Sequence, residues 1–242
     1  MVNIDTVYQR VLTLANKEQR GYITPQEFNL LANQAQMEIF EQYFYDIARY
    51  NKVPGNDGEF SDYLTILNEK ISFFEQERGG SWTNQNMGSS MQLPDELYRL
   101  GRVRIARTQV EMLSSEEFDA ARISYLTSPT PNRPIAYLAG NRLWVATGPS
   151  QFVDATIGNM NISYIRKPHD VKWGYTVITG SAAINGKPLY DPSTSVHFEL
   201  HISDESELVY RILGLAGITI NKPGLDTVAT NKITAQQTQE KQ

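Results

Sequence analysis

The chain contains no cysteine and only three histidines among its 242 residues. The absence of cysteine excludes disulfides, thiol catalysis and thiolate zinc sites, and it fits assembly in a reducing cytoplasm. Long apolar runs are also missing, since no window approaches the roughly eighteen apolar residues of a spanning helix. The first residues lack a basic segment followed by an apolar run, so we expect neither export by a classical signal nor insertion in a membrane.

Basic residues are too few and too scattered for a typical nucleic-acid-binding protein. The formal net charge is −5, from 22 basic and 27 acidic side chains, and no dense block of Lys and Arg is present. Because such proteins carry a basic patch, we expect no direct DNA binding. Hydrophobic residues make up 40% of the chain and aromatics 10%. This content is ample for a packed core in one large domain or two small ones.

No motif in the sequence names a reaction. The chain has no GxGxxG, GxxxxGK[ST], GxSxG or HExxH pattern. His197 and His201 are four residues apart, which is a metal-binding spacing on a helix. However, Val196, Phe198 and Leu200 alternate with polar residues, which predicts a strand and separates the two histidines by about 13 Å. We therefore expect a protein that is not an enzyme and that holds no metal and no cofactor.

The most informative segment runs from Tyr22 to Tyr50. Thr24, Pro25 and Glu27 can form a capping box, so a helix is predicted to begin at Pro25. It would span roughly 40 Å, and its apolar stripe is wider than one face. We therefore predict that this helix contacts neighbouring subunits on two sides. The candidate interface residues are its aromatic side chains and one tryptophan of a later loop, which either docks on a neighbour or folds back: Phe28, Phe40, Tyr43, Phe44, Tyr45, Tyr50 and Trp82.

Helical periodicity dominates the first part of the chain and returns near its end. Helices are predicted at residues 4–18, from Pro25, from Ser61, and within 203–225 with Ser203 as the cap. We assign residues 1–92 to a helical unit with its connecting loop. The late helix at 203–225 is predicted to return to that unit.

Strand patterns fill the segment between these helices, residues 93–202. A short helix at about 115–126, capped by Ser114, interrupts them, and Gly140-Asn141 predicts a hairpin. The predicted fold class is therefore α+β. An N-terminal helical bundle is completed by the late helix, with an inserted antiparallel β region and an extended C-terminal tail.

The tail, residues 226–242, is too polar to bury its own backbone. Because fixing a backbone costs about 1 to 2 kcal/mol per residue, we expect this segment to order only on a partner. The candidate partner-binding residues combine its few apolar side chains with neighbouring polar ones: Thr227, Val228, Asn231, Ile233, Gln236 and Gln237.

Four arginines gather on and beside one predicted strand: Arg99, Arg102, Arg104 and Arg107. Alternation places Arg102 and Arg104 on one face and Val103 and Ile105 on the other. A solvated sheet face explains these arginines. Alternatively, they pair with carboxylates of an adjacent subunit or face a channel through which a polyanion passes.

A different interpretation treats four aromatic side chains as a platform for a carbohydrate or another small molecule. These side chains are Trp144, Tyr164, Trp173 and Tyr175. Alternation places several of them equally well in the core of a sheet.

Several segments together resemble structural proteins of tailed-bacteriophage virions. They are ANKEQRGYITPQEFNLLANQAQMEIFEQYFYD, LPDELYRLGRV, ISYIRKP and YDPSTSVHFEL. The order of N-terminal helices, β-containing middle, late helix and tail is most similar to the head-to-tail adaptor, or connector ring, proteins of short-tailed phages. Another virion role, such as a lower tail ring or a head-associated protein, remains open on the same segments.

The resemblance to adaptors implies a ring, usually twelve-fold, beneath the portal. Its partners would be the portal protein, other copies of the chain, and tail or further ring proteins. DNA would meet the protein only by passing through the channel, and no membrane is implied. The location would be the head-tail junction of the virion, after assembly in the host cytoplasm. The tail at 226–242 would reach onto the portal.

Overall fold

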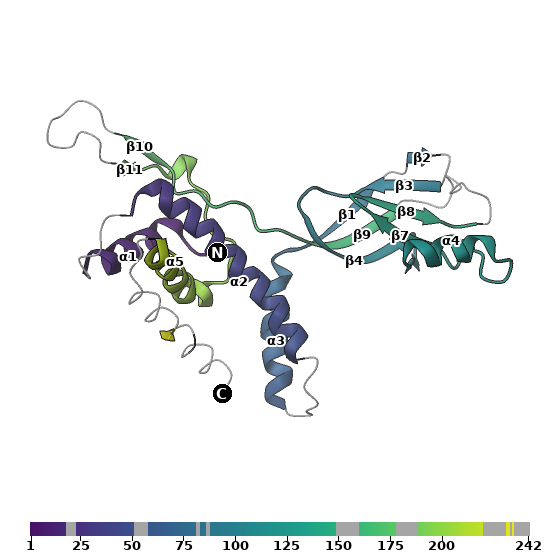
Figure 1. Cartoon of the computed structure of the whole chain (residues 1–242), viewed down its shortest axis with the longest axis horizontal. Coiled ribbons are helices and arrows are strands. Elements are labelled where there is room, and N and C mark those ends of the chain that lie inside the picture. The colour runs from purple at the N-terminus through teal and green to yellow at the C-terminus, as the bar shows by residue number, and fades with distance from the viewer. Residues whose placement is uncertain are drawn as a thin grey trace. The chain divides into compact units, whose positions relative to one another are not determined.

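The computed structural model describes residues 1–17, 23–50, 58–80, 83–85, 88–148, 160–177, 188–219, 231–232 and 234. The chain divides into two compact units. One is a helical unit of Met1–Phe73 with Pro168–Gln242, and the other is a β unit of Phe74–Lys167. The β unit is therefore an insertion in the helical unit, which confirms the predicted α+β fold (Figure 1).

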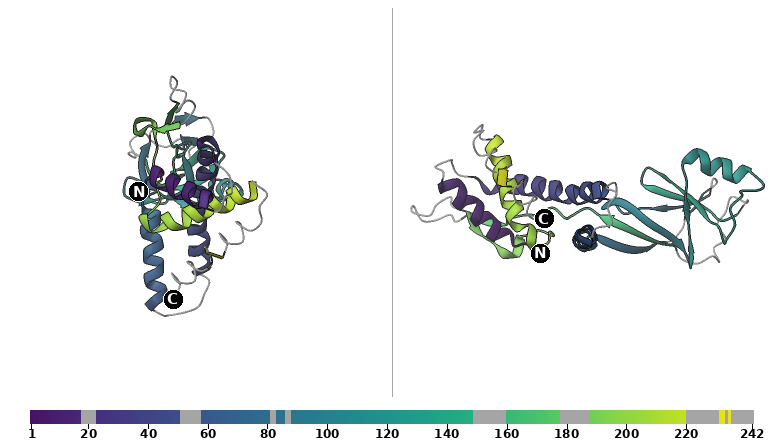
Figure 2. Two further views of the ribbon diagram at one scale, coloured as in Figure 1. Left: turned by 90° about the vertical axis from the view of Figure 1, so that its left-hand side faces the viewer. Right: turned by 90° about the horizontal axis from the view of Figure 1, so that it is seen from below.

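Four α-helices of the described chain form the body of the helical unit. They are α1 (Ile4–Lys17), α2 (Pro25–Tyr50), α3 (Gly58–Ser72) and α5 (Glu205–Thr219). The late helix α5 packs on α1 and α2, and α3 packs on α2, as two further views show (Figure 2). The hairpin strands β10 (Tyr175–Val177) and β11 (Pro188–Tyr190) pair antiparallel in the same unit. The predicted closure of the bundle by a late helix is thus confirmed.

The start of α2 forms as the sequence predicts. The Glu27 N–H donates to the Thr24 hydroxyl at 3.3 Å, and the Thr24 N–H donates to the Glu27 carboxylate at 2.9 Å. These bonds satisfy donors that a helix start leaves free. The bond from the Thr24 N–H, followed by that from its hydroxyl, lowers the pKa of Glu27. A second capping box, between Ser114 and Glu117, begins α4 (Ser115–Ile123), as predicted.

The start of the late helix differs from the prediction. Ser203 does not cap it. Instead, the ring of His201 accepts from the Ser203 N–H at 3.2 Å, and a 3₁₀ turn, η3 (Ile202–Asp204), leads into α5. The strand predicted at Val196–Leu200 is also absent as a ladder, since Val196 and Phe198 make isolated bridges with Lys172 and Val2. Phe198 and Leu200 are buried in the helical unit instead of joining a sheet, whereas Val196 is 42% exposed.

The described residues of the β unit form two sheets and one helix. Its strands are β1 (Glu75–Gly80), β2 (Thr83–Gln85), β3 (Gly88–Gln92), β4 (Leu97–Ile105), β5 (Thr108–Gln109), β6 (Glu111–Met112), β7 (Ile135–Ala139), β8 (Arg142–Ala146) and β9 (Met160–Arg166). The strand orders are β1-β9-β4-β5 and β2-β3-β8-β7-β6. The described strand pairs are antiparallel except β6 with β7. The predicted hairpin of β7 and β8 is confirmed, with Gly140 at a φ of 58° in its turn.

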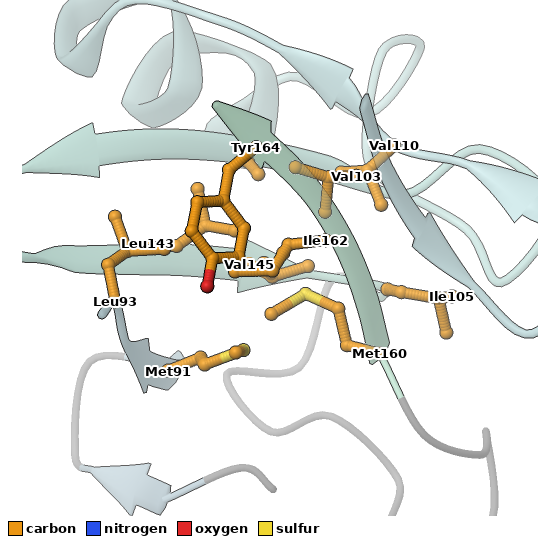
Figure 3. Close-up of a cluster of buried hydrophobic side chains, with 11 residues drawn as sticks. Met91, Leu93, Val103, Ile105, Val110, Leu143, Val145, Met160, Ile162 and Tyr164 are labelled. Carbon is orange, nitrogen blue, oxygen red and sulfur yellow. The ribbon is translucent and has the colours of Figure 1, made fainter. Parts of the chain in front are cut away.

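The core of the β unit lies between the two sheets. Inward side chains of β4 and β9, among them Val103, Ile162 and Tyr164, face Leu143 and Val145 of β8 (Figure 3). On the other side of the second sheet, Phe118 of α4 packs against Ile135 and Tyr137 of β7. Buried and more exposed side chains alternate along β9. This alternation is the pattern that predicts strands in this region.

The predicted boundaries between the helical and β regions are wrong at both ends. The segment between Glu77 and Gln92, expected as a loop attached to the helices, contains most of β1 and all of β2 and β3, which belong to the β unit. Their polar, glycine-containing sequences pair mainly through the backbone, so they lack the alternation that marks a strand. Residues 168–202, expected in the β region, belong to the helical unit, where side chains of α2 bond the backbone of His169, Val171 and Trp173.

Candidate functional site

The inner face of α2 is the core of the helical unit. Phe28 and Phe40 are fully buried, and Tyr43 is 5% exposed. The ring of Phe28 packs on Tyr8 at a centroid distance of 4.7 Å, and the Tyr43 hydroxyl donates to Asp204. The prediction of these three aromatics as subunit contacts is therefore wrong, because other residues of the same chain, among them Tyr8 and Asp204, cover them.

The outer face of α2 retains fewer of the candidate interface residues. Phe44 is half-buried and its ring meets Phe40 at 5.1 Å. Tyr45 is 68% exposed, and Leu30, on the same side of the helix, is 72% exposed. The side chain of Tyr50 and all of Trp82 lie outside the described residues. Among the described candidates, Tyr45 is thus the one whose side chain is exposed and available to a neighbouring subunit.

Side-chain amides of α2 hold an extended segment of the chain that returns from the β unit. Asn33 donates to the Val171 carbonyl at 3.0 Å and accepts from its N–H at 2.7 Å. Asn29 donates to the Trp173 carbonyl at 3.3 Å and accepts from its N–H at 2.7 Å. The spacing of four residues places both amides on one side of the helix. Each amide therefore bonds the N–H and the carbonyl of one residue of the extended segment, as an adjacent strand would in a sheet.

Gln36 extends this row by one helical turn. Its amide donates to the His169 carbonyl at 2.8 Å and accepts from the Glu199 N–H at 3.2 Å. The carboxylate of Glu199 in turn accepts from the His169 N–H and lies 2.9 Å from its ring. We call Asn29, Asn33 and Gln36 the amide row. These residues were not predicted from the sequence, although amide side chains at helical spacing beside an apolar stripe are a signal for such contacts. Gln36 is buried, and Asn29 and Asn33 are half-buried.

A buried ion pair joins three elements of the helical unit. Asp204 is 2% exposed, and its carboxylate lies 2.7 Å from the Lys70 ammonium of α3 and 2.5 Å from the Tyr43 hydroxyl of α2. The Ser203 hydroxyl also donates to it, at 3.1 Å. A buried carboxylate is stable only with such partners. The group therefore fixes α2, α3 and the start of α5 to one another.

The four candidate arginines all lie on the surface of the β unit: Arg99, Arg102, Arg104 and Arg107. Val103 and Ile105, which alternate with Arg102 and Arg104, are 1% and 2% exposed. The predicted division of this strand into a basic outer face and an apolar inner face is therefore confirmed.

Most of the candidate tail residues, Thr227, Val228, Ile233, Gln236 and Gln237, lie outside the described residues. Asn231 is described, and it is exposed in helical conformation together with Lys232.

Two of the four aromatic side chains expected as a binding platform are buried. Trp173 is 2% exposed in the helical unit, where its indole N–H donates to Asp5 at 3.0 Å. Tyr164 is 3% exposed in the core of the β unit. Trp144 and Tyr175 are half-buried, and their rings stack on Tyr137 and Trp173 at centroid distances of 6.3 and 5.9 Å. Burial thus removes Tyr164 and Trp173 from the platform, and the two remaining rings belong to different units.

Metal and membrane sites receive no support from the described part of the chain. No group of three or more His, Asp or Glu side chains there could hold a metal ion, and His197 accepts from the Ile4 N–H at 3.3 Å. Within the same residues, no helix has both the length and the hydropathy to cross a bilayer.

A scan against protein-family models gave no match, and a search of curated proteins gave none either.

Proposed function

We propose that this chain is a structural protein of a tailed-phage virion, a head-to-tail adaptor that binds beneath the portal as a ring. In that role it extends the DNA channel and supports tail attachment. The observation that carries the proposal is the order of its parts. Along the chain, the two parts of a helical unit flank an inserted β unit, the second part contains the late helix, and a polar tail follows. This is the order on which the resemblance to connector proteins rests.

The partners follow from this role. They are the portal protein, other copies of the chain, and tail or further ring proteins. The resemblance to adaptors implies that the copies form a twelve-fold ring. The hydrogen bonds and the buried ion pair inside the helical unit support a rigid subunit. Its elements are fixed by the amide row and by the buried Asp204–Lys70 pair, and hydrogen-bonded groups of this kind rigidify a fold.

The tail is proposed as the portal-binding segment, and its deletion tests this role. A chain lacking residues 226–242 is expected to bind the portal of the same phage at least tenfold more weakly, because a segment that folds on a partner makes extensive contact there. Binding would be measured by interferometry on immobilised portal. A matched deletion of residues 238–242 keeps all six candidate residues and should leave the affinity unchanged. Unchanged affinity after the longer deletion would show that the tail is not the portal contact.

A further inference from the structure

One sheet of the β unit carries opposite charges on its two sides. In this sheet β9 lies between β1 and β4. The register and the bonds of Ser163 define two rows across β1, β9 and β4: Glu75–Ile165–Arg99 and Glu77–Ser163–Arg102. The glutamates and arginines of both rows are exposed. The outer face of the sheet is therefore acidic along β1 and basic along β4.

Both charged strands have an open edge in the described chain. β1 is the last strand of its sheet. On the far side of β4, β5 pairs with Arg104 and Ile105, and the Val110 N–H donates to the Val103 carbonyl. No described strand pairs with the outer edge of residues 97–102. Strand edges of this kind present backbone groups to which another chain can pair.

The charges select which edges can meet. Two β1 edges would bring glutamates against glutamates, and two β4 edges would bring arginines against arginines, which is repulsive between neighbouring strands. A β1 edge beside a β4 edge instead places Glu75 and Glu77 near Arg99 and Arg102. Arg78 belongs to the other face of β1, since it pairs with Ile162 of the core. The pattern thus disfavours both symmetric contacts and favours the mixed one.

We propose that the β1 edge of one copy docks beside the β4 edge of a second copy. The charge balance of the units agrees with a contact made by the β unit, which holds 10 basic and 9 acidic residues, whereas the helical unit holds 12 and 18. Because two different patches meet, the contact is heterologous and can repeat around a ring. Exposed ion pairs are weak singly, so the contact becomes effective where many copies are held together.

This inference rests on the ring of the proposed function but not on the portal. It predicts a weak contact between free copies that can be trapped covalently. The absence of cysteine makes that test clean, because any disulfide must involve an introduced pair. Glu77 and Arg102 flank β9 within one chain, so their Cα atoms lie about 10 Å apart. This exceeds the reach of about 7 Å for an intramolecular disulfide.

The full chain with Glu77→Cys and Arg102→Cys is therefore oxidised at high concentration and separated without reductant. We expect a ladder of dimers, trimers and larger species, because each copy offers both edges. Either single variant alone should stay monomeric, and a mixture of the two should stop at dimers. A strong dimer of one single variant would reveal a symmetric contact, and the absence of a ladder would remove the contact altogether. Both results overturn the proposal.

Reversing charges in the same double-cysteine chain distinguishes a loss of the contact from a loss of folding. Adding Glu75→Arg should reduce the ladder at least tenfold, and combining it with Arg99→Glu should restore it. If the combination fails to restore the ladder although both variants show the circular dichroism of the parent, the charges do not select the contact. A ladder from a chain that ignores portal would keep this contact and reject the adaptor role. Portal-bound rings that never cross-link would do the reverse.

Discussion

Replacing Lys70 with methionine is expected to lower the free energy of unfolding of the helical unit by about 3 to 5 kcal/mol. The change leaves the buried carboxylate of Asp204 without the ammonium that lies 2.7 Å away, and breaking a buried pair costs this much because the remaining charge is not compensated. Urea dependence of hydrogen exchange at the amides of α5 would report the loss, since these amides belong to the helical unit.

The control for this prediction removes the whole group. A variant with Lys70→Met, Asp204→Leu and Tyr43→Phe should recover most of the stability, because apolar residues often replace a buried ion pair without net cost. Glu69→Gln, at the exposed neighbour of Lys70, should change stability by less than about 0.5 kcal/mol. A loss below about 1 kcal/mol for Lys70→Met would contradict the role assigned to the pair.

Replacing Asn33 with alanine is expected to cost the helical unit about 2 to 4 kcal/mol. The backbone N–H and carbonyl of Val171 both lose their partner, and each buried group left without a hydrogen bond costs about 1 to 3 kcal/mol. Val171 itself is 2% exposed. Its amide should also exchange with solvent much faster, which would locate the damage at the returning segment.

Gln34, the exposed residue next to Asn33 on α2, supplies the matched control. Gln34→Ala should leave both the stability and the exchange of the Val171 amide unchanged. If Asn33→Ala proves as mild as Gln34→Ala, the amide row does not hold the segment. Asn33→Asp keeps the acceptor for the Val171 N–H but removes the donor to its carbonyl. It should therefore destabilise less than alanine while still protecting that amide.

The elements that could be predicted from the sequence are those with local signals. Thr24 and Glu27 lie three residues apart, and the start of α2 at Pro25 follows from them. The same holds for Ser114 and α4, and for the hairpin at Gly140. In each case the residues that specify the structure are neighbours in the chain, so no knowledge of the tertiary fold is needed.

The elements that could not be predicted depend on distant partners. Strand β1 is polar and mostly exposed, and it is a strand because it pairs with β9, whose residues lie 80 to 90 positions further along the chain. Phe28 and Phe40 indicated a contact, but an apolar stripe does not say whether its cover comes from the same chain or another. Here the same chain supplies it. The sequence therefore predicted the basic face of β4 correctly. It wrongly assigned Phe28, Phe40 and Tyr43 of α2 to a subunit interface.

The most direct test of the proposed adaptor role is the native mass of the purified chain, alone and mixed with the portal of the same phage. The account predicts a monomer or weakly associating species alone, because exposed ion pairs contribute little singly. With portal it predicts a ring of many copies, held by contacts that act together. A stable monomer that ignores portal would contradict the adaptor role and move the chain to another position in the virion or outside it.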